Sequence, residues 1–94
     1  MRIIRARCPE ARGGLPEQIA RFLQALRGRV LVKPPGVAET LDFTRALLSL
    51  RQEALEPAVV TETLGCLLKD RHDLESVTPT DVAALVASAR EARS

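Results

Sequence analysis

The chain has 94 residues, a hydrophobic fraction of 46% and only two aromatic residues, Phe22 and Phe43. A chain of this length forms one small core, and a core built from Leu, Val, Ile and Ala argues against a large sheet. The net charge of +2 indicates no particular partner by itself. The composition therefore favours an all-α fold.

The charge is unevenly distributed along the chain. Up to Lys33 there are eight basic and two acidic residues, and after Lys33 there are six basic and ten acidic residues. This asymmetry suggests that the N-terminal third meets an acidic partner, which is a nucleic acid, a nucleotide or another subunit. No signal peptide is recognisable and the apolar runs are too short to cross a bilayer, so we expect a cytoplasmic protein with free Cys8 and Cys66.

Residues 1–14 are expected to form an extended arm and linker. The arm begins with RIIRARC and stops at Pro9, which is typical of a short strand, but the chain offers nothing obvious for it to pair with. We therefore expect a preceding domain that is missing from this chain. Residues 15–94 are expected to form the helical domain.

The first helix is predicted to run from Pro16 to Leu26, because apolar residues recur there at helical spacing. Gly28 is predicted to end it in a left-handed cap, followed by an extended segment from Arg29 to Lys33. The proline and glycine residues at 34–36 then interrupt the chain, and a second helix is predicted from Val37 to Leu50.

Two more helices are predicted in the second half of the chain. The third spans Pro57 to Lys69, where Gly65 is expected to mark a close helix contact. A charged loop then covers residues 70–77. The fourth helix begins with the capping box of Thr78-Pro79-Thr80-Asp81 and frays over residues 90–94. The predicted architecture is a small four-helix bundle with an extended N-terminal arm.

Two blocks of sequence resemble a known family. These are KPPGVAETLDF, at residues 33–43, and TLGCLLKDRHD, at residues 63–73. They are similar to the C-terminal helical lid of MoxR-type AAA+ ATPases, in the branch associated with maturation of carbon monoxide dehydrogenase and other molybdenum hydroxylases. The opening RIIRARCPE resembles the segment that leaves the last strand of the ATPase core in that family.

The resemblance implies a lid that covers a nucleotide site and transmits its state in an oligomeric chaperone for metalloenzyme maturation. The Walker A and Walker B motifs would lie upstream, so the chain is not expected to be an enzyme by itself and needs no cofactor. The parent protein would use ATP and Mg. The implied partners are the AAA+ core, neighbouring subunits and a von Willebrand A-type protein, with no membrane.

The resemblance also implies a nucleotide-facing elbow at the start of the second helix. Its residues are Pro34, Pro35, Gly36, Glu39, Thr40 and Arg45. Glu39 or Thr40 falls near the position of the family's sensor-two arginine, and Glu39 is expected to cap or orient the elbow. Arg45 is the only candidate cation on this helix. The alternatives are an ordinary tight turn and an Arg45 that is solvated or pairs with Asp42 on the surface.

Other functions are weaker alternatives. Cys8, Cys66, Asp70, His72 and Asp73 lack the tight spacing of a metal site, so no metal is expected. A stand-alone helical interaction or DNA-binding module stays open, although no aromatic residues are interleaved with the N-terminal arginines and nucleic acid is not the favoured partner. An isolated lid would expose an apolar face through which it can self-associate.

Overall fold

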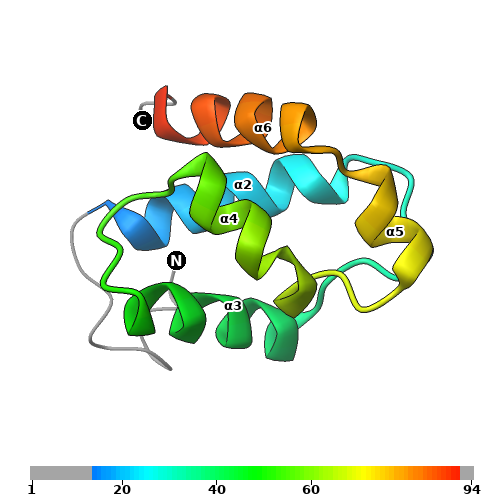
Figure 1. Cartoon of the computed structure of the whole chain (residues 1–94), viewed down its shortest axis with the longest axis horizontal. Helices are drawn as coiled ribbons and strands as arrows, with labels where there is room; N and C mark the ends of the chain where they lie inside the picture. The colour runs from blue at the N-terminus through cyan, green and yellow to red at the C-terminus, as the bar shows by residue number, and fades with distance from the viewer. Residues whose placement is uncertain (1–13, 92–94) are drawn as a thin grey trace.

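The computed structural model describes residues 14–91, which contain five α-helices, one 3-10 helix and no strand (Figure 1). The all-α prediction is confirmed for this part of the chain. The extended arm predicted for residues 1–14 lies, apart from Gly14, outside the described residues. In chain order the elements are α2 (Leu15–Arg27), α3 (Val37–Ser49), α4 (Pro57–Thr63), η1 (Leu64–Cys66), α5 (Arg71–Ser76) and α6 (Pro79–Glu91).

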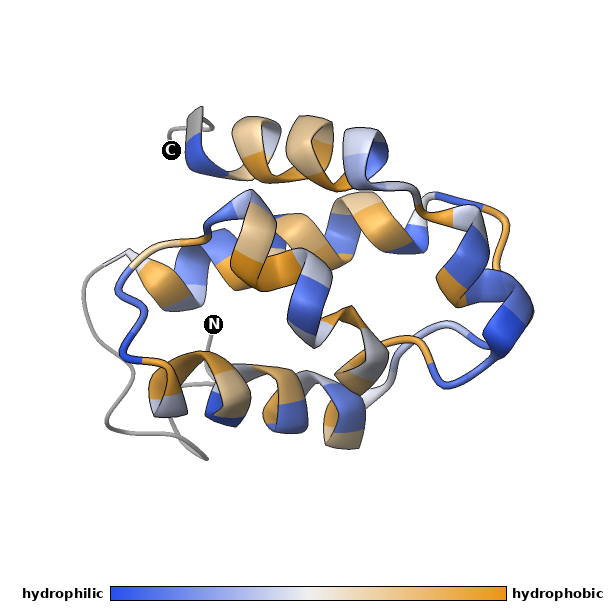
Figure 2. Ribbon diagram, viewed as in Figure 1, coloured by the Kyte–Doolittle hydropathy of each residue, from blue (hydrophilic) through white to orange (hydrophobic). Residues whose placement is uncertain are grey.

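The helices pack around one aliphatic core. Helix α6 packs against α2 and α4, while α3 packs against α4 and η1, and α5 lies at one end of the molecule (Figure 1). Apolar residues face the interior of this arrangement (Figure 2). No helix in residues 14–91 combines the length and the apolar character that crossing a membrane requires. The largest fully buried side chains are Phe22, Phe43, Leu15, Ile19, Leu26, Leu47, Leu55, Leu67, Leu68, Val60, Val82 and Val86.

The two aromatic residues join α2 to α3. The rings of Phe22 and Phe43 are both fully buried and stack with their centroids 6.0 Å apart and their planes 15° apart. A stacked pair of this kind contributes about 0.5–1.5 kcal/mol beyond the burial of its area. The remaining core is aliphatic, as the composition predicts.

Helix α2 forms as its apolar stripe predicts, but its end differs from the prediction. Gly28 has φ −72° and ψ −12°, so the predicted left-handed cap is wrong. The amides of Gly28 and Arg29 instead donate to the carbonyls of Ala25 and Leu26, at 3.2 and 3.0 Å. These i to i+3 bonds satisfy the terminal carbonyls without a left-handed residue.

The third predicted helix is shorter than expected. Helix α4 ends at Thr63, and the chain continues as the 3-10 turn η1 before residue 70. The hydroxyl of Thr63 donates to the carbonyl of Val59 at 2.8 Å, a bond that tends to bend a helix. A Cβ added to Gly65 meets no heavy atom within 4 Å, so its predicted close helix contact is wrong. Gly65 lies instead in the turn that follows the helix.

The predicted charged loop at residues 70–77 contains helix α5. Its N-cap is Asp70, whose side chain accepts a hydrogen bond from the amide of Asp73 at 3.2 Å. Six residues are too few to show a helical apolar period, which is why the sequence pattern missed this element. The following capping box is confirmed, because Thr78 and Asp81 exchange backbone-to-side-chain hydrogen bonds of 3.1 and 3.2 Å.

Helix α3 ends with a strained residue. Arg51 has φ 58°, the left-handed region that glycine adopts far more easily than arginine. The amide of Arg51 donates to Leu48 at 2.9 Å, and the amide of Gln52 donates to Leu47 at 3.0 Å. These two bonds form a Schellman motif, which fixes Arg51 in this conformation.

Replacing this residue tests the strain. We expect Arg51→Gly to raise the free energy of unfolding by about 0.5–1 kcal/mol, because glycine adopts the left-handed conformation at lower cost. Urea unfolding of the two proteins measures the difference. Arg51→Ala is the control, since alanine keeps the strain and we expect it to match the parent chain. An equal gain from both substitutions would show that the arginine side chain, and not the backbone, is responsible.

Candidate functional site

The proline elbow forms the start of α3, and its polar groups bond to one another. Pro35 is buried, while Pro34 and Gly36 are exposed. The amide of Gly36 donates to Oε1 of Glu39 at 2.9 Å. The hydroxyl of Thr40 donates to the carbonyl of Gly36 at 2.8 Å, and the amide of Thr40 reaches the same carbonyl at 3.0 Å. Glu39 and Thr40 thus hold both backbone groups of Gly36.

These contacts change the acidity of Glu39. The hydrogen bond from the Gly36 amide lowers the pKa of the Glu39 carboxyl below its ordinary value of 4.5, and the backbone amide of Glu39 itself adds to this effect. The positive charges of Lys33 and Lys69 lower that pKa further. Glu39 also complements the positive end of the α3 dipole. The carboxylate form of Glu39 is therefore the form that caps the helix.

Glu39 and Thr40 form a first clamp, meaning a group of side chains whose hydrogen bonds fix the backbone of the elbow. Helix α2 supplies a second clamp. The guanidinium of Arg27, in the last turn of α2, donates from Nε and Nη2 to the carbonyl of Pro35, at 3.3 and 3.1 Å. Charge-assisted hydrogen bonds of this kind are stronger than neutral ones. The buried proline is therefore tied directly to the preceding helix.

The third clamp is Asp73, which the sequence analysis considered only as a metal ligand. Asp73 lies on α5 and is completely buried. Its Oδ1 accepts from the amide of Val32 and its Oδ2 from the amide of Lys33, both at 2.7 Å. Both carboxylate oxygens thus bind the loop that leads into the elbow. No sequence signal marks this contact, because its partners are backbone amides 41 and 40 residues away.

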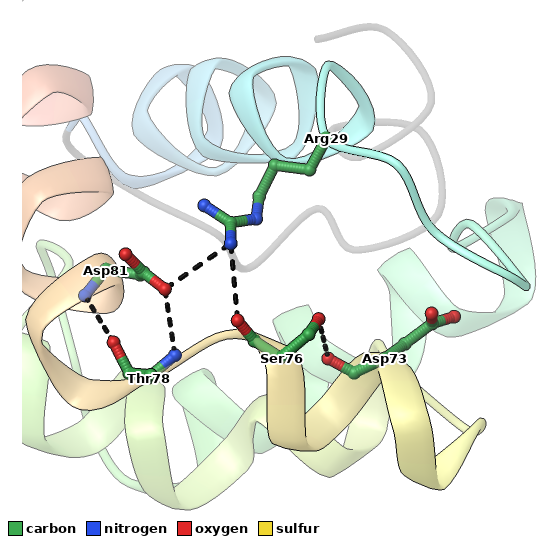
Figure 3. A network of polar contacts seen from close by, with 5 residues as sticks. All are labelled: Arg29, Asp73, Ser76, Thr78 and Asp81. Atoms are coloured by element: carbon green, nitrogen blue, oxygen red, sulfur yellow. Dashed lines mark hydrogen bonds and ion pairs between the residues drawn. The ribbon is translucent and has the colours of Figure 1, made fainter.

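Arg29 connects the same loop to α5 and α6. Figure 3 shows its guanidinium reaching the backbone carbonyl of Ser76 and the carboxylate of Asp81; the distances from Nη2 are 3.3 and 3.4 Å. The Thr78 backbone amide, the Thr78 hydroxyl and the nearby Arg29 lower the pKa of Asp81 below its ordinary value of 3.8. Figure 3 also shows the hydroxyl of Ser76 bonded to the carbonyl of Asp73, at 2.8 Å. Arg29 and Asp73 together thereby fix the loop between α2 and α3 to helices α5 and α6.

The structure brings together all the predicted elbow residues except Arg45. That residue is exposed on α3, one turn or more beyond the elbow, and its side chain makes no hydrogen bond or ion pair with any residue in 14–91. The described structure therefore does not contain the alternative pairing of Arg45 with Asp42, and the exposed side chain agrees with the alternative of a solvated arginine. Sequence reasoning missed Arg27 and Asp73 as elbow residues, since both act on backbone groups.

The described residues hold no group of three or more His, Cys, Asp or Glu side chains placed to bind a metal ion. Cys66 is a half-buried free thiol, while Cys8 lies outside the described residues. Asp70 and Asp73 direct carboxylate oxygens at backbone amides. What the arrangement provides is a rigid backbone corner whose polar groups are largely satisfied from within the chain.

Comparison of the chain with known protein families, with curated proteins and with solved structures gave no match.

The buried clamp leads to a stability prediction. Asp73→Asn replaces one acceptor with an amide donor, so the amide of Val32 or of Lys33 loses its partner. A hydrogen bond to a charged group contributes about 2 kcal/mol, and we expect urea unfolding to show a loss of that size. Asp42→Asn is the matched control, because Asp42 is exposed on α3. Equal effects of the two substitutions would contradict the clamp.

The capping carboxylate leads to a pH prediction. The folded-state pKa of Glu39 is lowered, so its stabilising effect is present at neutral pH and is lost as the pH falls below its ordinary value of 4.5. We expect the free energy of unfolding to fall less steeply between about pH 5 and pH 3 in Glu39→Gln than in the parent chain, because glutamine caps without titrating. Glu62→Gln, exposed on α4, is the control and should follow the parent chain. Parallel pH profiles for all three proteins would exclude the capping role.

Proposed function

We propose that this chain is the helical lid of a MoxR-like AAA+ ATPase, which covers the nucleotide site and transmits its state to the rest of the protein. The proposal starts from the resemblance of residues 33–43 and 63–73 to such lids. The observation that supports it best is the closed set of hydrogen bonds around the elbow. Arg27, Glu39 and Asp73 fix the backbone that leads into α3, so the helix direction is set by the rest of the domain.

A lid that transmits the state of a nucleotide site needs this kind of rigidity. A lid that transmits a nucleotide state has to move as one body, so a change at one end of α3 reaches the opposite end without being absorbed by a loose loop. Because Asp73 and Arg27 come from different helices, their contacts couple α2, α3 and α5 at a single corner. In this proposal α2, α3, α4 and α6, which are the four helices that the sequence predicts, correspond to the lid bundle. Helix α5 is a short addition to it.

The chemistry belongs to the parent protein in this proposal. ATP and Mg would bind to a core that carries the Walker motifs, and the lid would contact this core, neighbouring subunits and a von Willebrand A-type partner in the cytoplasm. The assembly would act as a chaperone that matures a molybdenum enzyme. Pro34, Pro35, Gly36, Glu39 and Thr40 would present the elbow towards the nucleotide, with Arg45 as the only cation of that set.

The proposal predicts that a Walker-containing core is encoded in frame before residue 1 or by a neighbouring gene. When core and lid are produced together, we expect Asp73→Asn to lower ATP turnover, because the elbow loses its clamp, while Asp42→Asn leaves turnover unchanged. Steady-state ATPase assays measure both. Arg45→Ala in the same protein separates two forms of the proposal: a raised KM for ATP places Arg45 at the nucleotide, and an unchanged KM leaves the elbow a purely mechanical part.

Two results would contradict the proposal. One is ATP hydrolysis by the purified 94-residue chain alone. The other is the absence of any Walker-containing core in the same reading frame or beside it, combined with salt-dependent binding of the chain to DNA, which would favour a nucleic-acid-binding module.

A further inference from the structure

Two chain segments at the α5 end of the molecule add little to the apolar core. No side chain is buried in the loop at residues 28–34, and the polar Asp73 is the only buried side chain in residues 69–76. Leu31 is the one apolar side chain of these segments that packs against the core, and it is only partly buried. The nearest buried residues on either side of the segments are Leu26, Pro35, Leu68 and Val77. Burial of apolar area supplies most of a domain's stability, so other forces hold these two segments.

Polar contacts join the two segments to each other. The carboxylate of Asp73 accepts from the amides of Val32 and Lys33, both at 2.7 Å, and Figure 3 shows Arg29 reaching the carbonyl at the end of α5, at 3.3 Å. A further bond, from Arg29 to Asp81 at 3.4 Å, leads from the segments to α6. The loop after α2 and helix α5 accordingly lie side by side at this end of the molecule (Figure 1).

The buried carboxylate makes separate movement of the two segments costly. If the loop moved away alone, Asp73 would stay behind as a buried carboxylate without its two donors, and a buried charge without partners is strongly unfavourable. If α5 moved away alone, the amides of Val32 and Lys33 would lose their acceptors. Release of both segments at once exposes all of these groups to water, which supplies new partners. Opening of the two segments together therefore costs less than opening of either one.

We propose that residues 28–34 and 69–76 form one cooperative unit, the end unit, which opens while the helical body of α2, α3, α4 and α6 stays packed. Local opening of this kind occurs where few apolar contacts are buried. In the open form the elbow keeps its contacts with Arg27 and Glu39 but loses its tie to α5. A partner that binds only one of the two forms would shift this equilibrium and change how firmly the elbow is held. The device belongs to the isolated chain and does not rest on the lid function.

Hydrogen exchange of single amides, followed by NMR on the full 94-residue chain at low urea concentrations, tests the proposal. The amides of Val32, Lys33 and Leu74 report on the end unit, because each donates to an oxygen within it. The amides of Phe22 and Val86 report on the helical body. We expect the three end-unit amides to share one opening free energy with a weak urea dependence, because little surface is exposed. The body amides should be protected at least about tenfold more strongly, with a steeper urea dependence.

A substitution in the helical body separates local opening from global unfolding. Ile19 lies in α2 and is completely buried. Ile19→Val weakens the body equally in the closed and open forms of the end unit. We therefore expect exchange of the Phe22 and Val86 amides to become about fivefold faster, while the end-unit amides stay within about twofold of the parent chain.

A substitution in the loop tests whether the two segments open together. Arg29→Met keeps an unbranched side chain but removes the bonds to α5 and α6, so the Leu74 amide on α5 should exchange about threefold faster or more. Asp73→Asn should accelerate the same amide by about tenfold or more. Arg45→Met is the matched control, because that exposed arginine lies outside the end unit, and it should leave Leu74 within about twofold of the parent chain. Amide NMR spectra establish that each variant is folded.

Three results would overturn the proposal. Equal protection and equal urea dependence of the end-unit and body amides would show that the domain opens only as a whole. Acceleration of both sets by the same factor in Ile19→Val would show the same. Different opening free energies for the loop amides and for Leu74, or a Leu74 amide that Arg29→Met and Asp73→Asn leave unchanged, would show that the two segments open independently.

Discussion

The hydrogen bonds from the Val32 and Lys33 amides to the buried carboxylate of Asp73 are the interaction on which the rest of the elbow depends. A buried charge is costly unless every lone pair that faces the protein is used, and here both oxygens are used at 2.7 Å. Asp73 also occupies the first turn of α5, where the helix dipole favours a negative charge. One side chain thereby determines the path of the loop between α2 and α3.

The other polar contacts extend this arrangement to neighbouring elements. Arg27 reaches the elbow from α2, Glu39 closes it from α3, and Arg29 ties its beginning to Asp81 on α6. None of these contacts requires an external ligand, so the corner is complete as it stands. This is why the mechanical interpretation of the elbow has more support than one in which its backbone groups bind an anion.

Features that depend on near neighbours were predictable from the sequence, and features that depend on distant ones were not. The Thr78-Asp81 capping box and the role of Glu39 follow from spacings of three residues, and the α2 stripe follows from helical periodicity. The role of Asp73 could not be predicted, because its partners are backbone amides some forty residues away, and the side chains of those residues do not reveal the contact. The early end of α4 at Thr63 could not be predicted either, because tertiary packing decides whether a short apolar run stays helical.

The stacking of Phe22 on Phe43 has a practical consequence. The chain contains no tryptophan and no tyrosine, and its only two aromatic rings are the pair that joins α2 to α3. The near-ultraviolet dichroism of the protein therefore arises from a single interface. A partly folded state that keeps its helices but separates α2 from α3 would lose that phenylalanine signal while its far-ultraviolet spectrum stayed intact. The chain thus carries its own optical reporter for one specific packing event.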